Sequence, residues 1–266
     1  MGTTPTAWLP PEVGRGDGAA ADGTWRSPGY RSSRMRGMAA IALLAAAAGS
    51  NALGVAVEIQ GLGLVDAAEA GTLKSAAANA FDSLRAGVGL VQVALYLASA
   101  VAVLAWLSRI VENVPPLTGR TPRRSPREAI GWWFVPFANF VVPYRIVSDA
   151  VRRLRTGGGD STESLLLPWW TLWLAGSLVG NLVVRLPTDT LGDVRTVFIL
   201  NALSAGATAV AGALLVLIVR GVERRSGVRA RALGIGHDPR PAWPQAPPAT
   251  PAGPTPPAPD DSGWPT

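Results

Sequence analysis

The chain has 266 residues, of which 48% are hydrophobic and only 16% are charged, and its formal net charge is +6. An average soluble domain has roughly 25% charged residues, so this composition is typical of a membrane protein with polar ends. The chain contains no cysteine, which excludes disulfides, thiolate metal sites and cysteine nucleophiles.

The first segment, residues 1–36, is rich in glycine, proline and threonine and has no apolar period. A segment of this kind cannot bury a hydrophobic core. We therefore expect a disordered N-terminal arm, which ends in the basic residues Arg31, Arg34 and Arg36.

Four later segments of 21 to 24 residues carry no charged side chain: 37–57, 86–108, 164–184 and 196–219. About 20 apolar residues in a helix cover the hydrocarbon layer of a bilayer, and a helix satisfies its own backbone hydrogen bonds there. The sequence therefore predicts an all-α fold, a four-helix transmembrane bundle over residues 37–220.

The loop between the second and third segments contains an uncharged run of 16 residues, 129–144, with the sequence AIGWWFVPFANFVVPY. This run is too short for a fifth crossing, and Pro136 and Pro143 interrupt it. We expect residues 129–155 to form an amphipathic or re-entrant element at the cytoplasmic interface, with Trp132 and Trp133 at headgroup depth.

A helix is expected from Pro143 to Arg155. Its apolar stripe consists of Phe140, Tyr144, Val147, Val151 and Leu154, spaced by three or four residues. Its basic residues, candidates for contact with anionic lipid, are Arg145, Arg152, Arg153 and Arg155. Such a helix either lies on anionic lipid or connects two spans and packs under the bundle, and the second alternative is favoured.

Polar residues inside the spans are few, and the amides among them are Asn51, Gln92, Asn181 and Asn201. They either bond across the bundle or line a polar path. Gly176 and Gly180 form a GxxxG motif, which mediates dimerisation in some proteins but more often packs helices within one chain.

The last segment, residues 221–266, is first basic and then proline-rich, and we expect it to be a disordered cytoplasmic tail. Its proline-rich part favours an extended polyproline conformation, which is a docking strip for some protein partners.

The basic residues predict the orientation of the chain. Of the 24 lysines and arginines, 20 lie in the N-terminal arm, the central loop and the tail. Such residues are retained on the cytoplasmic side of a membrane, so both termini are expected to be cytoplasmic. Positive charge beside a bilayer suits anionic headgroups, and this explanation is favoured over nucleic-acid binding.

Several motifs share a common order in the chain. Trp106-Leu107-x-Arg109 is followed by Asn113 and Ser125-Pro126. A long motif at 131–144 contains Trp132, Trp133, Pro136, Asn139, Pro143 and Tyr144, and Trp169-Trp170 comes after it. This order resembles a bacterial membrane family, common in actinobacteria, that is catalogued only as a domain of unknown function with about four helices. The resemblance covers roughly residues 86–220. It implies a four-helix architecture in the bacterial cytoplasmic membrane, but it does not indicate an activity.

The sequence is compatible with three functions. The preferred one is a non-enzymatic scaffold or adaptor that meets a protein partner through the central loop or tail, or forms a homo-oligomer. The alternatives are a small channel or passive transporter, and a membrane enzyme that modifies lipid. No paired carboxylates, histidine cluster or serine triad lies near an interface, so we assign no catalytic, cofactor-binding or metal-binding residue.

Overall fold

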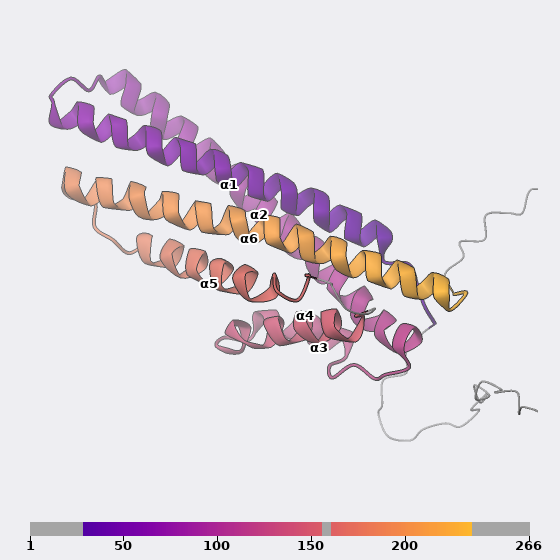
Figure 1. Ribbon diagram of the computed structural model, residues 1–266. Helices are drawn as coiled ribbons and strands as arrows, with labels where there is room; N and C mark the ends of the chain where they lie inside the picture. Colours follow the sequence, from indigo (N-terminus) through magenta and orange to yellow (C-terminus); the bar gives the residue numbers. More distant parts are fainter. Residues whose placement is uncertain (1–28, 156–160, 236–266) are drawn as a thin grey trace, which may run out of the picture.

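The computed structural model describes residues 29–155 and 161–235, and all regular secondary structure in these two ranges is helical (Figure 1). Four of these helices are long and apolar enough to cross a membrane. The expected all-α fold with four spans is therefore confirmed. The expectations for residues 1–28 and for the proline-rich tail from residue 236 lie outside the described residues. The disordered arm that was expected to extend to residue 36 ends earlier, because Asn113 binds the backbone of Arg31 and a helix begins at Arg34.

The four helices differ in length from the charge-free segments: three helices are longer and one is shorter. Three of them, α1 (Arg34–Glu69), α2 (Ser75–Thr118) and α6 (Leu191–Ala232), have 36, 44 and 42 residues, whereas α5 (Leu166–Val183) has 18. At about 1.5 Å per residue, α2 is about 66 Å long, roughly twice the thickness of the hydrocarbon layer. The ends of these helices therefore extend beyond the apolar zone.

The four long helices pack side by side in the order α2, α1, α6, α5 (Figure 1). The helix α1 contacts both α2 and α6, while α5 packs against α6. Large apolar side chains in the middle of α2 face outward, and Leu90 and Val101 are 73% and 69% exposed. Apolar side chains exposed along a helix of this length are suited to contact with lipid.

The GxxxG motif lies at the contact between α5 and α6. A Cβ atom at residue 176 would lie 2.7 Å from Oγ1 of Thr208 and 3.1 Å from the backbone oxygen of Ser204. The hydroxyl of Ser204 donates a hydrogen bond of 2.8 Å to the carbonyl of Gly176. Both glycines of the motif therefore pack against a helix of the same chain, as the sequence analysis favoured.

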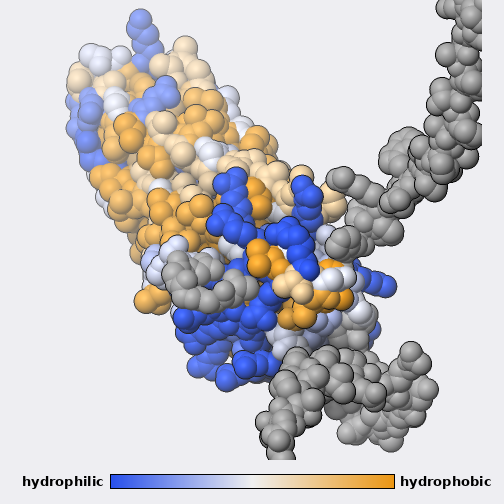
Figure 2. Space-filling view, turned by 45° about the vertical axis from the view of Figure 1, so that its right-hand side comes forward, coloured by the Kyte–Doolittle hydropathy of each residue, from blue (hydrophilic) through white to orange (hydrophobic). Residues whose placement is uncertain are grey.

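The connection between α2 and α5 contains two short α-helices, α3 (Pro126–Gly131) and α4 (Val142–Arg153). Two single-turn 3₁₀ helices, η1 (Trp132–Phe134) and η2 (Ala138–Phe140), lie between them. Together with the C-terminal ends of α2 and α6, these elements form a compact region at one end of the molecule, which we call the cap (residues 106–155 and 218–232). Figure 2 shows hydrophilic residues gathered around this end, beside the apolar body.

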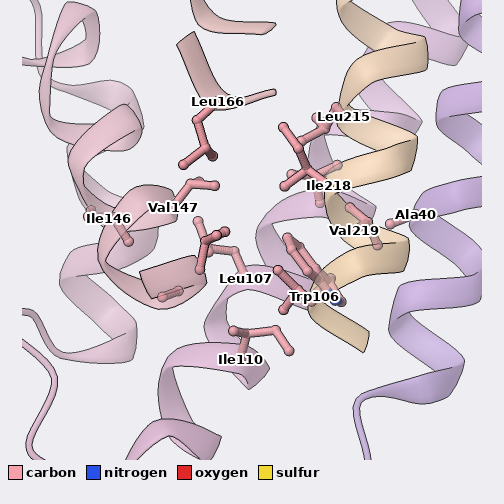
Figure 3. Close-up of a cluster of buried hydrophobic side chains, with 14 of the residues drawn as sticks. Ala40, Trp106, Leu107, Ile110, Ile146, Val147, Leu166, Leu215, Ile218 and Val219 are labelled. Atoms are coloured by element: carbon pink, nitrogen blue, oxygen red, sulfur yellow. The ribbon is translucent and has the colours of Figure 1, made fainter. Parts of the chain in front are cut away.

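The cap has a hydrophobic core to which every long helix contributes (Figure 3). Its central residues come from α2, α4, α5 and α6, and α1 adds Ala40. The fully or nearly fully buried side chains include Trp106, Leu107, Ile110, Val147, Val151, Leu154, Leu166, Ile218, Val219 and Val222. Most of the buried apolar volume thus lies near one end of the spans rather than at their middle.

The apolar stripe of α4 takes part in this core. Val147, Val151 and Leu154 are buried, and Tyr144 is half-buried. The alternative of a connecting helix packed against the bundle is therefore confirmed. Phe140 is an exception, because it precedes α4 in η2 and its side chain is exposed.

The boundary expected between the spans and the tail lies too early. We expected the tail to begin at residue 221, but α6 continues to Ala232. The basic residues of this segment ended the apolar run without ending the helix, since arginine is a good helix former. Residues 221–232 pack into the cap and bury Val222 and Ala230.

Candidate functional site

The cap begins at a turn that is set by the Ser125-Pro126 pair. The hydroxyl of Ser125 accepts a 3.3 Å hydrogen bond from the backbone N–H of Glu128, whose carboxylate accepts a 2.8 Å bond from the N–H of Ser125. This capping box starts α3, with proline in its first turn. The bond from the Ser125 N–H holds the pKa of Glu128 below its usual value.

The two tryptophans of the long motif have different surroundings. Trp133 packs edge-on against Trp170 and Trp173 of α5, with ring centroids 6.2 and 6.1 Å apart. The guanidinium of Arg124 lies over the ring of Trp132, 5.0 Å from its centroid. Trp133 thus joins the cap to α5, and Trp132 supports the loop that carries Arg124.

The remaining motif residues shape the segment before α4. Pro143 is buried in the first turn of α4, and Tyr144 packs against the ring of Trp170 at a centroid distance of 6.1 Å. The side-chain oxygen of Asn139 is buried and accepts no hydrogen bond within the described ranges. These contacts give most of the motif a packing role.

The loop that holds Pro136 presents apolar side chains to the outside. Phe137, which follows Pro136, has a positive φ of 62° and is 85% exposed, and Phe134 is 73% exposed. Val135, Phe140 and Val141 are also exposed. Five neighbouring apolar side chains form a surface that is unfavourable in water and favourable in the interfacial region of a bilayer. We call this surface the aromatic loop (residues 134–141).

A pocket of about 430 Å³ lies on the polar side of α4, between α4, α2 and the loop before α3. It is lined by four arginines and one acidic residue, namely Arg123, Arg124, Arg145, Arg152 and Asp149. The net charge of these side chains is +3, and apolar residues such as Val114 and Ile146 form the rest of the wall. We call this cavity the arginine pocket.

Existing ion pairs leave two of these arginines available. Asp149 binds Arg153 at 2.6 Å and lies 3.9 Å from Arg123, and Arg124 lies 3.7 Å from Glu128. Arg145 and Arg152 are exposed and make no ion pair or side-chain hydrogen bond with the residues that the structure describes. An anion in the arginine pocket would therefore meet two guanidinium groups that have no other partner there.

The four arginines selected from the sequence separate into two pairs. Arg145 and Arg152 line the arginine pocket, whereas Arg153 is held by Asp149 and donates to the carbonyl of Thr121. Arg155 lies 3.7 Å from Glu163 and is not part of the lining. Sequence reasoning missed Arg123 and Arg124. Their signal was a pair of adjacent arginines in a turn-rich segment, but their position opposite α4 depends on the tertiary fold.

Long-range hydrogen bonds hold the cap together around the pocket. The buried side chain of Arg225 donates a 2.8 Å bond to the carbonyl of Val151 near the end of α4. Arg229 donates to the carbonyl of Leu117 near the end of α2. Positive groups at the last carbonyls of a helix are favoured by its dipole, so α6 fixes the ends of α2 and α4.

The segment before α1 is fixed by Asn113 of α2. The side-chain oxygen of Asn113 accepts a 3.2 Å bond from the backbone N–H of Arg31, and its NH₂ group donates a 2.8 Å bond to the carbonyl of Arg31. Asn113 is only 1% exposed. The start and the end of the described chain therefore lie at the same end of the molecule as the cap (Figure 1).

A family model described as a domain of unknown function (DUF4328) matches residues 69–224. The match extends from the end of α1 into α6 and includes the arginine pocket and the aromatic loop. No curated protein and no solved structure matches the chain.

Proposed function

This chain belongs to the DUF4328 family, a domain of unknown function. We propose that it is a non-enzymatic membrane scaffold whose cap binds anionic lipid headgroups. The proposal rests chiefly on the arginine pocket, where Arg145 and Arg152 have no partner among the described residues. A phosphodiester is a suitable ligand, because guanidinium groups form charge-assisted, often bidentate, hydrogen bonds with phosphate oxygens.

The aromatic loop supports a lipid as the source of this phosphate. Phe134 and Phe137 are among the most exposed large apolar residues of the described chain. Insertion of these side chains at the interface would bury them and hold the cap against the bilayer. Contact of the cap with the bilayer would bring headgroup phosphates close to the cap, which contains the arginine pocket.

The distribution of charge supports a cytoplasmic position for the cap and for both termini. Twenty of the 24 basic residues lie in the N-terminal segment, the central loop and the C-terminal segment of the sequence. The positive-inside rule places such segments in the cytoplasm. The cytoplasmic leaflet also carries the anionic lipids that attract arginines, at about 1 kcal/mol for each residue near the surface.

A scaffold also needs a partner. The sequence offers two candidates for this contact, the basic outer surface of the cap and the proline-rich segment of the tail. We propose that a headgroup in the arginine pocket positions the cap at the membrane, so that a protein partner or a second copy of the chain can be held there.

Lipid selectivity of the purified protein tests the lipid-binding part of the proposal. The full-length protein is exchanged into vesicles of phosphatidylcholine with a small fraction of phosphatidylglycerol, and the lipids that remain bound after extraction are quantified. In the double variant Arg145→Gln, Arg152→Gln we expect the enrichment of phosphatidylglycerol to fall by about thirtyfold, since each of the two arginines contributes on the order of 1 kcal/mol.

A matched control removes the same charge elsewhere. Lys74 and Arg185 lie outside the cap, and Arg185 is exposed. The double variant Lys74→Gln, Arg185→Gln is expected to retain the enrichment of the unmodified protein. If both double variants retained the enrichment of the unmodified protein, the proposal would be contradicted. If both lost it, the cause would be a general effect of charge rather than binding in the arginine pocket.

A further inference from the structure

A second cavity, also of about 430 Å³, lies between α1, α2 and α6 and is lined mainly by residues from the half of each helix that is remote from the cap. Its polar lining includes Asn51, Glu58, Asp82, Arg85, Gln92 and Asn201. Three of the four amides that the sequence analysis singled out thus meet in one cavity. Asn181 is not among them, because it lies on α5 and donates to the carbonyl of Ser177.

The charges in this cavity favour a cation. Its two acids and one base give a net charge of −1, and Arg85 is already engaged. The Nε of Arg85 donates a 3.0 Å bond to Oε1 of Glu58, and its guanidinium lies over the ring of Phe198. The other oxygen of Glu58 is buried and accepts no hydrogen bond from any described residue. Asp82 is exposed and forms no ion pair within the described ranges.

The amides add further acceptors. The NH₂ group of Asn51 donates a 2.8 Å bond to the carbonyl of Ala47, and that of Gln92 donates a 3.2 Å bond to the carbonyl of Ser50. Because both NH₂ groups bond to backbone carbonyls, the amide oxygens remain as acceptors. Gln92 fits closely against Gly54, where a Cβ atom would collide with its nitrogen.

The depth of the cavity makes these acceptors effective. Asn51, Gln92 and Asn201 lie five or six residues inside the charge-free segments, which corresponds to about 8 or 9 Å along a helix. Electrostatic attraction is stronger at such a depth than in water. We propose that this cavity is a binding site for a small organic cation with a primary ammonium group, which donates to the free oxygen of Glu58 and to the amide oxygens.

The volume and the surroundings of the cavity are consistent with binding rather than conduction. A volume of about 430 Å³ holds a small organic molecule. Beyond Asn51, towards the cap, lies an apolar cavity of about 130 Å³ that is lined by Trp133, Trp169 and Trp173. A bare cation would have to leave its polar partners to enter this second cavity, which costs several kcal/mol. The ammonium group is therefore retained on the polar side of Asn51.

Calorimetric titration of the full-length protein in phosphatidylcholine nanodiscs tests this site. The probe is phenethylammonium chloride, and empty nanodiscs give the contribution of partition into lipid. The matched neutral probe is 2-phenylethanol, which has the same ring and chain without the positive charge. We expect saturable binding of phenethylammonium and none of 2-phenylethanol.

Two variants test the two acidic residues of the cavity. Glu58→Gln keeps an oxygen for Arg85, and Asp82→Asn changes an exposed residue with no ion pair in the described chain. We expect each to weaken binding, Glu58→Gln by about tenfold or more. The control Asp189→Asn removes an acid from an exposed position outside the cavity and should leave the affinity unchanged.

Several results would overturn the proposal. Equal binding of 2-phenylethanol would show that the ammonium group is not recognised. A second contradicting result would be that Asp82→Asn binds phenethylammonium as tightly as Asp189→Asn does, while Glu58→Gln either keeps its affinity or does not fold. The acids of the cavity would then be excluded as the groups that attract the cation. A protein that is stabilised by sodium chloride, but not by phenethylammonium, would have an inorganic-cation site instead.

Discussion

At the scale of single residues, buried polar side chains in this protein bond to backbone or side-chain groups of distant segments. Asn113 binds both backbone groups of Arg31, Arg225 binds the carbonyl of Val151, and Trp106 donates a 2.8 Å bond from its indole nitrogen to Glu223. Each of these contacts joins segments that are more than 70 residues apart in the chain. A buried backbone group without a partner costs about 1–3 kcal/mol, so such side chains have large effects on stability.

The Asn113→Leu substitution tests this role. Leucine has a similar size but leaves the N–H and carbonyl of Arg31 without their partner, so we expect a loss of about 1–3 kcal/mol in the free energy of unfolding. The measurement is unfolding of the purified protein in detergent, followed by tryptophan fluorescence. Asn181→Leu is the control, since Asn181 is exposed and bonds within its own helix. Similar losses in both variants would contradict the assignment.

At the scale of helices, the sequence predicts where the chain meets lipid better than where each helix ends. Charged side chains are expensive inside a bilayer, so the charge-free segments located all four spans. The same charges are compatible with a helix in water, so α6 could continue through Arg220, Arg224 and Arg225 to the cap. Contacts between helices were less predictable, although the GxxxG motif gave the pairing of α5 with its neighbour some support.

The Gly176→Ala substitution tests the contact between α5 and α6. A methyl group at this position would lie 2.7 Å from Oγ1 of Thr208, which is held by its own bond to the carbonyl of Ser204. Because the backbone oxygen of Ser204 also lies only 3.1 Å from this position, we expect α5 to shift and the protein to lose about 1–3 kcal/mol of stability. Gly49→Ala is the control, since nothing lies within 4 Å of its Cβ position. Resistance to unfolding in detergent should fall only in the first variant.

At the scale of the whole molecule, a row of four helices is closed at one end by the cap. The sequence indicated the basic surface, the apolar stripe of α4 and the bent segment before it. It did not indicate that Arg123 and Arg124 face Arg145 and Arg152 across a pocket, because that arrangement depends on how α2, α4 and the intervening loop fold together. Nor did it show that amides from three different spans meet in one cavity.

Cysteine labelling tests the orientation of the molecule. The chain has no cysteine, so each introduced thiol is unique. We expect Thr121→Cys and Leu233→Cys, at the cap end, to be protected from a membrane-impermeant maleimide in intact cells. Thr72→Cys and Asp189→Cys, at the opposite end, should react, and all four positions are exposed in the structure. A thiol at residue 121 that reacts while the one at residue 233 is protected would exclude the proposed topology.

The position of the buried core has a consequence for the biosynthesis of the protein. Ile218, Val219 and Val222 belong to α6, the last helix of the described residues, yet they complete the core that α2 and α4 begin. Helices can enter the bilayer one after another during translation, but this core cannot close until α6 has been made. A nascent chain that stops before residue 218 would have its spans inserted and its core still open to water, where proteases that remove incomplete membrane proteins can recognise it.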